Sequence, residues 1–113
     1  MKLTASNHLT VTELSALETV INAKDRLLVL VYASWCPFCR RFLPVFEQYA
    51  QGREDFWAVQ DDDEIVAEAY GVDCIPTVLF FEKGELTERL DGQLGIGLRE
   101  EELAAFIERC CLA

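Results

Sequence analysis

Residues 27–39 read LLVLVYASWCPFC, an apolar run followed at once by two cysteines that have two residues between them. The run from Leu27 to Tyr32 predicts a buried strand, and the apolar spacing after Cys39 predicts a helix. At such a junction the sulfur of Cys36 lies at a helix N-terminus, where the macrodipole and free backbone N–H groups stabilise a thiolate. Cys39 follows one turn later, within reach of a disulfide. The pattern predicts dithiol–disulfide exchange chemistry.

The apolar periodicity predicts one α/β domain over residues 1–113, without a repeat, a linker or a low-complexity segment. Helices are expected at about 11–23, 36–51, 62–70 and 99–111, and strands at about 27–33, 56–60, 77–81 and 85–90. A weaker signal near residues 7–9 favours a further short strand. This order predicts a central mixed sheet of four to five strands with four helices on its two faces.

Local signals at the helix ends refine these bounds. Thr10 and Glu13 match a capping box for the first helix. Asp62 or Asp63 is expected to be the N-cap of the third helix. Pro44 falls inside the second helix and is expected to kink it.

Composition excludes several classes of partner. The chain carries 20 acidic and 10 basic residues, a net charge of −10, which disfavours nucleic acid and anionic membranes. The longest apolar run is seven residues, too short for a membrane span, and the N-terminal residues show no signal-peptide core. Hydrophobic residues make up 51% of the chain, enough for a core without disulfides. We expect a cytoplasmic monomer.

The five cysteines are an odd number, and in a cytoplasmic protein a Cys-x-x-Cys motif indicates catalysis or metal binding rather than a structural disulfide. Cys74 is close in sequence to Pro76. One interpretation is that it packs as a small residue in a tight loop. The alternative is a functional role, in which it contacts substrate, becomes glutathionylated or forms a regulatory disulfide. Cys110 continues the apolar face of the last helix and is expected in the core. Cys111 is expected at the surface.

Trp35-Cys36-x-x-Cys39, Pro44 and Ile75-Pro76-Thr77 make this chain resemble the thioredoxin family over nearly its whole length. The resemblance rests on Trp35-Cys36-x-x-Cys39 at a strand–helix junction, on Pro44 eight residues after the first cysteine, and on Ile75-Pro76-Thr77, which is similar to the family's cis-proline loop. Gly84 and Gly92 match the hairpin turn and the glycine that precedes the last helix. The resemblance implies a thioredoxin fold and a thiol–disulfide oxidoreductase that reduces protein disulfides without a metal or an organic cofactor.

The resemblance also implies a role for each site residue. Cys36, as the exposed cysteine, attacks a client disulfide, and the more buried Cys39 resolves the mixed disulfide. Pro76 in cis leaves the backbone of Ile75 free to pair with an extended substrate segment. The expected apolar docking patch consists of Trp35, Pro37, Phe38, Ile75 and Gly92. The expected partners are disulfide-containing client proteins and an electron donor similar to thioredoxin reductase.

The sequence departs from the family pattern at several positions. Pro37-Phe38 stands where Gly-Pro is usual and is more similar to the dipeptide of glutaredoxins; this dipeptide tunes the reduction potential. Leu30 stands where the family commonly has a buried Asp, and Trp57 where a nearby Lys is frequent. Tyr32 replaces a usual Trp. We therefore expect Cys39 to lose its proton through water or another group, without a buried carboxylate.

Three alternatives remain at this stage. A glutaredoxin-like reductase of glutathione mixed disulfides is one, although Ile75 replaces its typical Val and no basic site for the glutathione carboxylates is evident. A redox-inert binding module of the same fold is another, and the intact Cys-x-x-Cys argues against it. A zinc module is the third; it would need His8 together with Cys36, Cys39 and Cys74, an awkward ligand set. We expect His8 to be a surface residue.

Overall fold

Five strands form one mixed sheet at the centre of the molecule, in the order β1-β3-β2-β4-β5. The computed structural model describes residues 7–112. The strands are β1 Asn7–Thr10, β2 Arg26–Tyr32, β3 Phe56–Gln60, β4 Thr77–Glu82 and β5 Glu85–Leu90. β3 runs parallel to both β1 and β2, whereas β4 runs antiparallel to β2 and to β5. The mixed sheet is confirmed, and the weak signal near residues 7–9 is a true edge strand.

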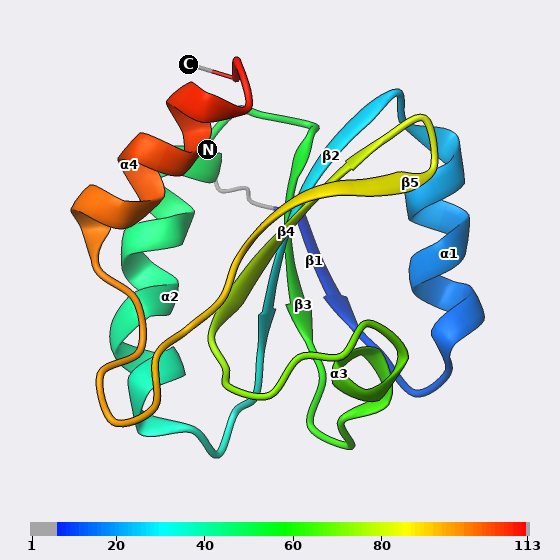
Figure 1. The fold of residues 1–113 in the computed structure, drawn as a ribbon. Helices are drawn as coiled ribbons and strands as arrows, with labels where there is room; N and C mark the ends of the chain where they lie inside the picture. Colours follow the sequence, from blue (N-terminus) through cyan, green and yellow to red (C-terminus); the bar gives the residue numbers. More distant parts are fainter. Residues whose placement is uncertain (1–6, 113) are drawn as a thin grey trace.

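Four helices cover the two faces of this sheet (Figure 1). They are α1 Leu14–Ala23, α2 Pro37–Ala50, α3 Ile65–Ala69 and α4 Glu100–Arg109. α2 and α4 lie on one face, and α1 and α3 lie on the other. The molecule therefore has the α/β architecture predicted from the sequence.

The strand β2 is buried on both faces, which explains its continuous apolar sequence. Leu28, Leu30 and Tyr32 belong to the core between the sheet and the α2–α4 pair. The alternate residues Leu27, Val29 and Val31 belong to the core on the α1–α3 face. Because successive side chains of a strand point to opposite faces, every second residue of β2 lies beneath the Cys-x-x-Cys helix.

Both predicted N-caps are wrong. α1 begins at Leu14, and Glu13 at its N-cap makes no side-chain hydrogen bond, because Thr10 is held in β1 opposite Gln60. α3 begins at Ile65, later than expected.

The carboxylate that caps α3 is that of Asp61, which is only 2% exposed. It accepts hydrogen bonds from the amides of Val66 at 3.0 Å and Ala67 at 2.8 Å. Asp62, one of the two residues predicted for this role, binds Ser34 instead. Long-range contacts therefore decided between neighbouring aspartates.

Candidate active site

The Cys-x-x-Cys motif lies where β2 leads into α2, with Cys36 as the N-cap of the helix and Pro37 as its first residue. Proline suits this position because its missing N–H would have no intrahelical partner. The amide of Cys39 donates to Sγ of Cys36 at 3.3 Å. This contact places a backbone donor and the positive end of the helix dipole at the sulfur, an arrangement that stabilises a thiolate.

Cys36 is less exposed than expected, with 5% of its surface accessible. It nevertheless lines a groove with a volume of about 650 Å³. The thiol is thus reached through this groove and not from an open surface.

Cys39 lies fully inside, with 0% exposure. Burial raises the pKa of its thiol to about 12, and the neighbouring Cys36 adds to this rise. The two cysteines are therefore unequal: the sulfur of Cys36 lies at the groove, and that of Cys39 is held as a thiol behind it.

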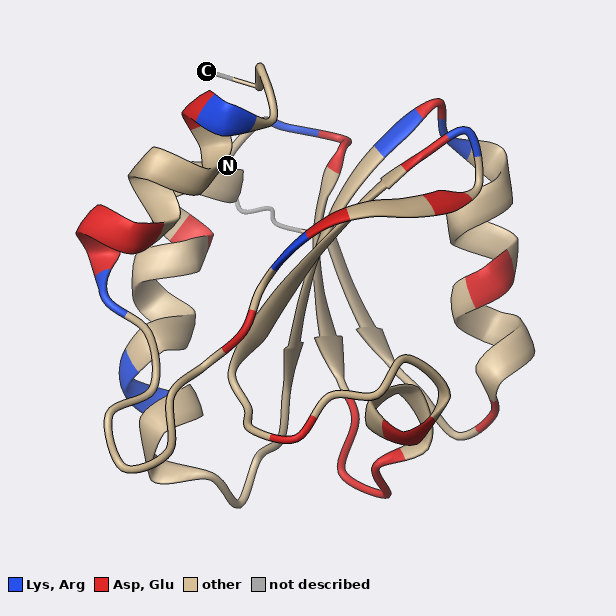
Figure 2. Cartoon of the chain, viewed as in Figure 1, with Lys and Arg blue, Asp and Glu red and all other residues tan. Residues whose placement is uncertain are grey.

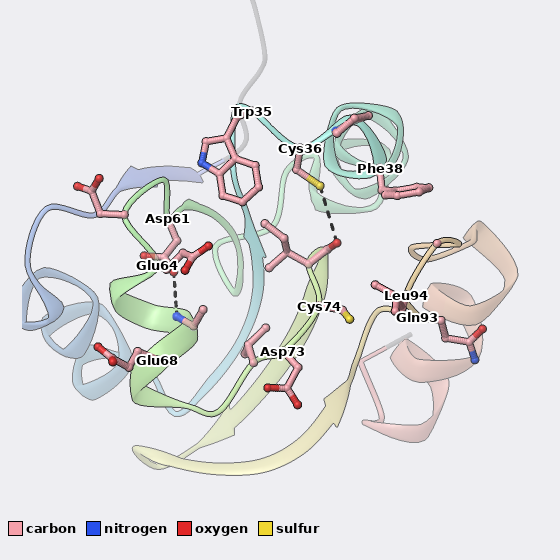
Figure 3. A pocket seen from close by; sticks show the side chains of 16 residues that line it. Trp35, Cys36, Phe38, Asp61, Glu64, Glu68, Asp73, Cys74, Gln93 and Leu94 are labelled. Atoms are coloured by element: carbon pink, nitrogen blue, oxygen red, sulfur yellow. Dashed lines mark hydrogen bonds between the residues drawn. The ribbon is translucent and has the colours of Figure 1, made fainter.

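The loop before β4 forms the opposite side of the sulfur. The Ile75–Pro76 peptide bond is cis. The thiol of Cys36 donates to the carbonyl of Ile75 at 3.8 Å, the contact dashed beside the sulfur in Figure 3. Within residues 7–112 the amide of Ile75 finds no acceptor. An unpaired backbone amide next to the Cys36 sulfur is the geometry needed to pair with an added extended strand.

The groove brings together most of the predicted docking residues. Trp35, Pro37, Phe38 and Ile75 all line it. Leu94, which the sequence analysis missed, lines it too and is 88% exposed. The available signal was an apolar residue within the glycine-containing connection before the last helix.

The matching family model is Thioredoxin, over residues 8–109 of the chain. The chain belongs to the thioredoxin family. A thioredoxin of Mycoplasmoides gallisepticum is 33% identical over 86 residues, covering 73% of this chain and 85% of the relative. A thioredoxin of Porphyra purpurea is 33% identical over 101 residues, covering 86% of this chain and 94% of the relative. The solved structure of a mutant thioredoxin from Halobacterium salinarum NRC-1 shares 34% identity and a TM-score of 0.72, over 95% of each chain.

Membership of the thioredoxin family, together with the Cys36–Cys39 spacing, makes this protein a thiol–disulfide oxidoreductase. The glutaredoxin-like and redox-inert alternatives are not favoured by these relatives. In the part of the chain that the structure describes, no three His, Cys, Asp or Glu side chains are grouped closely enough to hold a metal ion. None of the helices in residues 7–112 has the length and apolar character to cross a membrane.

Gly92 differs from the other predicted docking residues because it does not line the groove. It lies next to the cis-proline loop, where its amide donates to Oγ1 of Thr77 at 3.2 Å. A Cβ atom at this glycine would lie 2.3 Å from the carbonyl oxygen of Pro76. Gly92 thus allows two backbone segments to approach closely.

Gly92→Ala should lower the free energy of unfolding by about 2–3 kcal/mol, since neither backbone segment can yield without moving the loop. Urea unfolding followed by circular dichroism measures this loss. Gly95→Ala is the control, because its Cβ would meet nothing within 4 Å and only its φ of +78° is unfavourable; it should lose about 1 kcal/mol. Equal losses for the two variants would show that the contact with Pro76 is unimportant.

Asp62 fixes the segment that precedes the first cysteine. Its carboxylate accepts the amide of Ser34 at 2.7 Å and the hydroxyl at 2.9 Å, and these bonds lower its pKa. Its backbone carbonyl accepts the indole N–H of Trp35 at 3.1 Å. The sequence analysis considered Asp62 only as a possible N-cap and missed this anchoring contact, which joins residues 27 positions apart.

The buried residues beneath Cys36 and Cys39 depart from the family pattern, as the sequence indicated. Leu30 is fully buried in the same core as Cys39 and supplies no proton acceptor.

The hydroxyl of Tyr32 contacts Nε2 of His8 and donates to Oε1 of Gln60 at 3.4 Å. Burial raises the pKa of Tyr32 to about 12, with further contributions from Glu47, Asp62 and Cys39. The neutral phenol of Tyr32 therefore lies in the same core as Cys39. His8 is exposed on β1, as predicted.

The remaining cysteines occupy three different settings. Cys74 is half-buried and lines the groove. Cys110 is in the core, where burial raises its pKa to about 11, and Cys111 is exposed. The expectations for Cys110 and Cys111 are confirmed.

The resolving step should accelerate about tenfold for each pH unit between pH 6 and 9, without a plateau, because the pKa of Cys39 lies near 12. The measurement is stopped-flow release of thionitrobenzoate from a mixed disulfide formed on Cys36. The same release by free dithiothreitol gives the control slope for an exposed thiol. A plateau beginning below pH 8 would reveal a nearby base that takes the proton of Cys39.

Proposed function

We propose that this oxidoreductase reduces disulfides of client proteins, with Cys36 as the nucleophile and Cys39 as the resolving cysteine. The observation that carries the proposal is the position of the Cys36 sulfur. This sulfur accepts a hydrogen bond from the amide of Cys39 at 3.3 Å and faces the groove beside Ile75. A sulfur at a helix N-terminus and next to an unpaired backbone edge is suited to attack a disulfide in an extended segment.

The reaction consists of two exchanges. The Cys36 thiolate attacks one sulfur of the client disulfide; a Cys36–client bond forms, the client S–S bond breaks, and a client thiolate leaves and takes up a proton. Cys39 then loses its proton and attacks Cys36, forming the Cys36–Cys39 disulfide and releasing the second client thiol. Two electrons pass from the dithiol to the client, so an external dithiol donor must reduce the site again.

The groove supports the proposed docking mode. A client strand would place its backbone against Ile75, with Pro76 in cis shaping the loop. Trp35, Pro37 and Phe38, together with Leu94, offer apolar contacts around the cysteine. Gly92 would act indirectly, by holding the loop in place.

The compartment and the electron donor of the protein are part of the same proposal. We infer that the chain acts as one domain in a reducing compartment, the cytoplasm, with a donor similar to thioredoxin reductase. The odd number of five cysteines supports a reducing compartment, because they cannot all pair in disulfides within one chain. The net charge of −10 supports protein clients over nucleic acid.

The test compares reduction of insulin disulfides with reduction of a glutathione mixed disulfide, each with excess donor. We expect insulin reduction to dominate and the Cys36–Cys39 couple to have a potential near that of thioredoxin, about −270 mV. Reduction of the glutathione substrate alone would assign a glutaredoxin-like activity instead. A potential of about −120 to −180 mV would indicate an oxidant or isomerase.

A further inference from the structure

The groove beside Cys36 has a strongly uneven charge. Among its lining residues are five carboxylates and no Lys or Arg. Asp61 is one of them, but it is buried and committed to capping α3. The other four are exposed and lie on or next to α3: Asp63, Glu64, Glu68 and Asp73. Figure 3 shows Glu64, Glu68 and Asp73 along the side of the groove opposite Phe38 and Leu94.

These four carboxylates are not neutralised by neighbouring cations. In the described part of the chain, none of them forms an ion pair within 4.0 Å. Arg89 contributes a positive field toward Asp73, but its guanidinium is bound to Asp91 at 2.8 Å and to the carbonyl of Tyr70.

The wall on the α2 side has the opposite character. It is formed by Pro37, Phe38 and Leu94, and beyond it Arg41 places its guanidinium 5.3 Å from the Phe38 ring centroid. Arg40 is exposed on the same turn. Figure 2 shows the acidic residues gathered around the β3–α3 loop and α3, and basic residues at the start of α2.

We propose that the groove selects client disulfides whose cysteine is flanked by Lys or Arg side chains that contact these four carboxylates, over disulfides flanked by Asp or Glu. The inference rests on the proposed function and names the substrate class of that site. A client segment paired with Ile75 passes between the two walls, so its side chains next to the cysteine meet either the carboxylates or the apolar wall. Charges of one sign in a groove raise the local concentration and association rate of oppositely charged ligands.

The preference acts on the first exchange. The Cys36 thiolate displaces one client sulfur as a thiolate, and the two electrons that the dithiol gives up are unchanged by the charge of the client. The charge of the groove changes only the rate at which the client disulfide is captured. We expect a lysine-flanked substrate to react at least about tenfold faster than a glutamate-flanked one at low ionic strength.

The experiment uses three disulfide peptides of identical sequence in which Lys, Gln or Glu flanks each cysteine. The second-order rate constant for reduction of each peptide by the protein is divided by the rate constant for its reduction by free dithiothreitol. This division removes the effect of the flanking charge on the reactivity of the disulfide itself. We expect the order Lys, Gln, Glu, with a Lys-to-Glu ratio of about ten or more that falls below about three in 0.5 M salt, where the Debye length is only a few ångströms.

A pair of matched variants locates the effect. The groove variant carries Asp63→Asn, Glu68→Gln and Asp73→Asn, and the control variant carries Glu54→Gln, Glu85→Gln and Glu108→Gln. The three control residues are exposed and outside the groove lining, and both variants have the same net charge. The Lys-to-Glu ratio should fall below about three in the groove variant and stay near the wild-type value in the control.

The outcomes separate the inference from the proposed function. Equal normalised rates for the three peptides, or equal ratios in the two variants, would overturn the charge preference while leaving disulfide reduction intact. Failure to reduce any of the peptides or insulin would overturn the proposed function itself. The salt dependence of the wild-type protein keeps the inference testable if the groove variant does not fold.

Discussion

Cys36→Ser should abolish disulfide reduction, lowering the rate by at least about 10³-fold, the scale seen when a covalent nucleophile is removed. A serine hydroxyl at the helix N-terminus is not ionised at neutral pH and cannot form the mixed disulfide. Cys39→Ser should also stop turnover, but by a different route: the first exchange proceeds and the client stays covalently bound to Cys36. Insulin reduction measures the first effect, and a non-reducing gel of the protein with a disulfide client measures the second.

Cys111→Ser is the matched control, because this cysteine is exposed and outside the groove. It should reduce insulin at the wild-type rate. If Cys36→Ser still formed a covalent adduct with the client, another thiol in the groove, that of Cys74, would be the nucleophile. If Cys39→Ser accumulated no adduct, resolution would not depend on this cysteine.

Leu30→Asp should lower the free energy of unfolding by about 3–5 kcal/mol at pH 7, because it places an unpaired carboxylate in a fully buried position. This is a large part of the total stability of a small domain. Burial raises the pKa of such a carboxyl above its unfolded value of about 3.9. The folded variant then binds more protons than the unfolded one above that pH, so its stability falls further as the pH rises.

The same substitution should change the kinetics of resolution. A carboxylate beneath Cys39 can accept its proton, so the rate should gain a step at the pKa of the new Asp, which the wild-type protein lacks. Leu30→Asn is the control, since it keeps the shape but carries no charge: its loss of stability should not vary with pH and its resolving rate should show no step. Urea unfolding between pH 4 and 8 and stopped-flow resolution measure the two effects. Identical pH profiles for the Asp and Asn variants would show that position 30 does not communicate with Cys39.

Much of the fold follows from local patterns. The apolar run of β2, the helical spacing after Cys39 and the turn residues of the β4–β5 hairpin predict the element order because they depend on neighbours in the sequence. The caps were less predictable. Asp61 and Asp62 are both chemically suited to cap α3, and only the approach of Ser34 to Asp62 decides which one does.

The residues of the site were predicted only in part, again because local motifs do not describe long-range contacts. Trp35, Phe38 and Ile75 follow from motifs, whereas Leu94 comes from a connection whose path along the surface no periodicity describes. Gly92 was predicted as a docking residue, and only the structure shows that it lies against the backbone of Pro76.

The sequence by itself determined the chemistry: two cysteines at a strand–helix junction, a proline loop before a strong strand, and Leu30 where a carboxylate would be expected. These features are local, fixed by spacing along one segment. The tertiary structure decided what surrounds that chemistry. It brings the carbonyl of Ile75 to Cys36 across 39 positions of sequence and aligns the carboxyl ends of β2 and β3, so that the acidic α3 segment borders the groove. Such contacts depend on sheet order and register, which no single segment encodes.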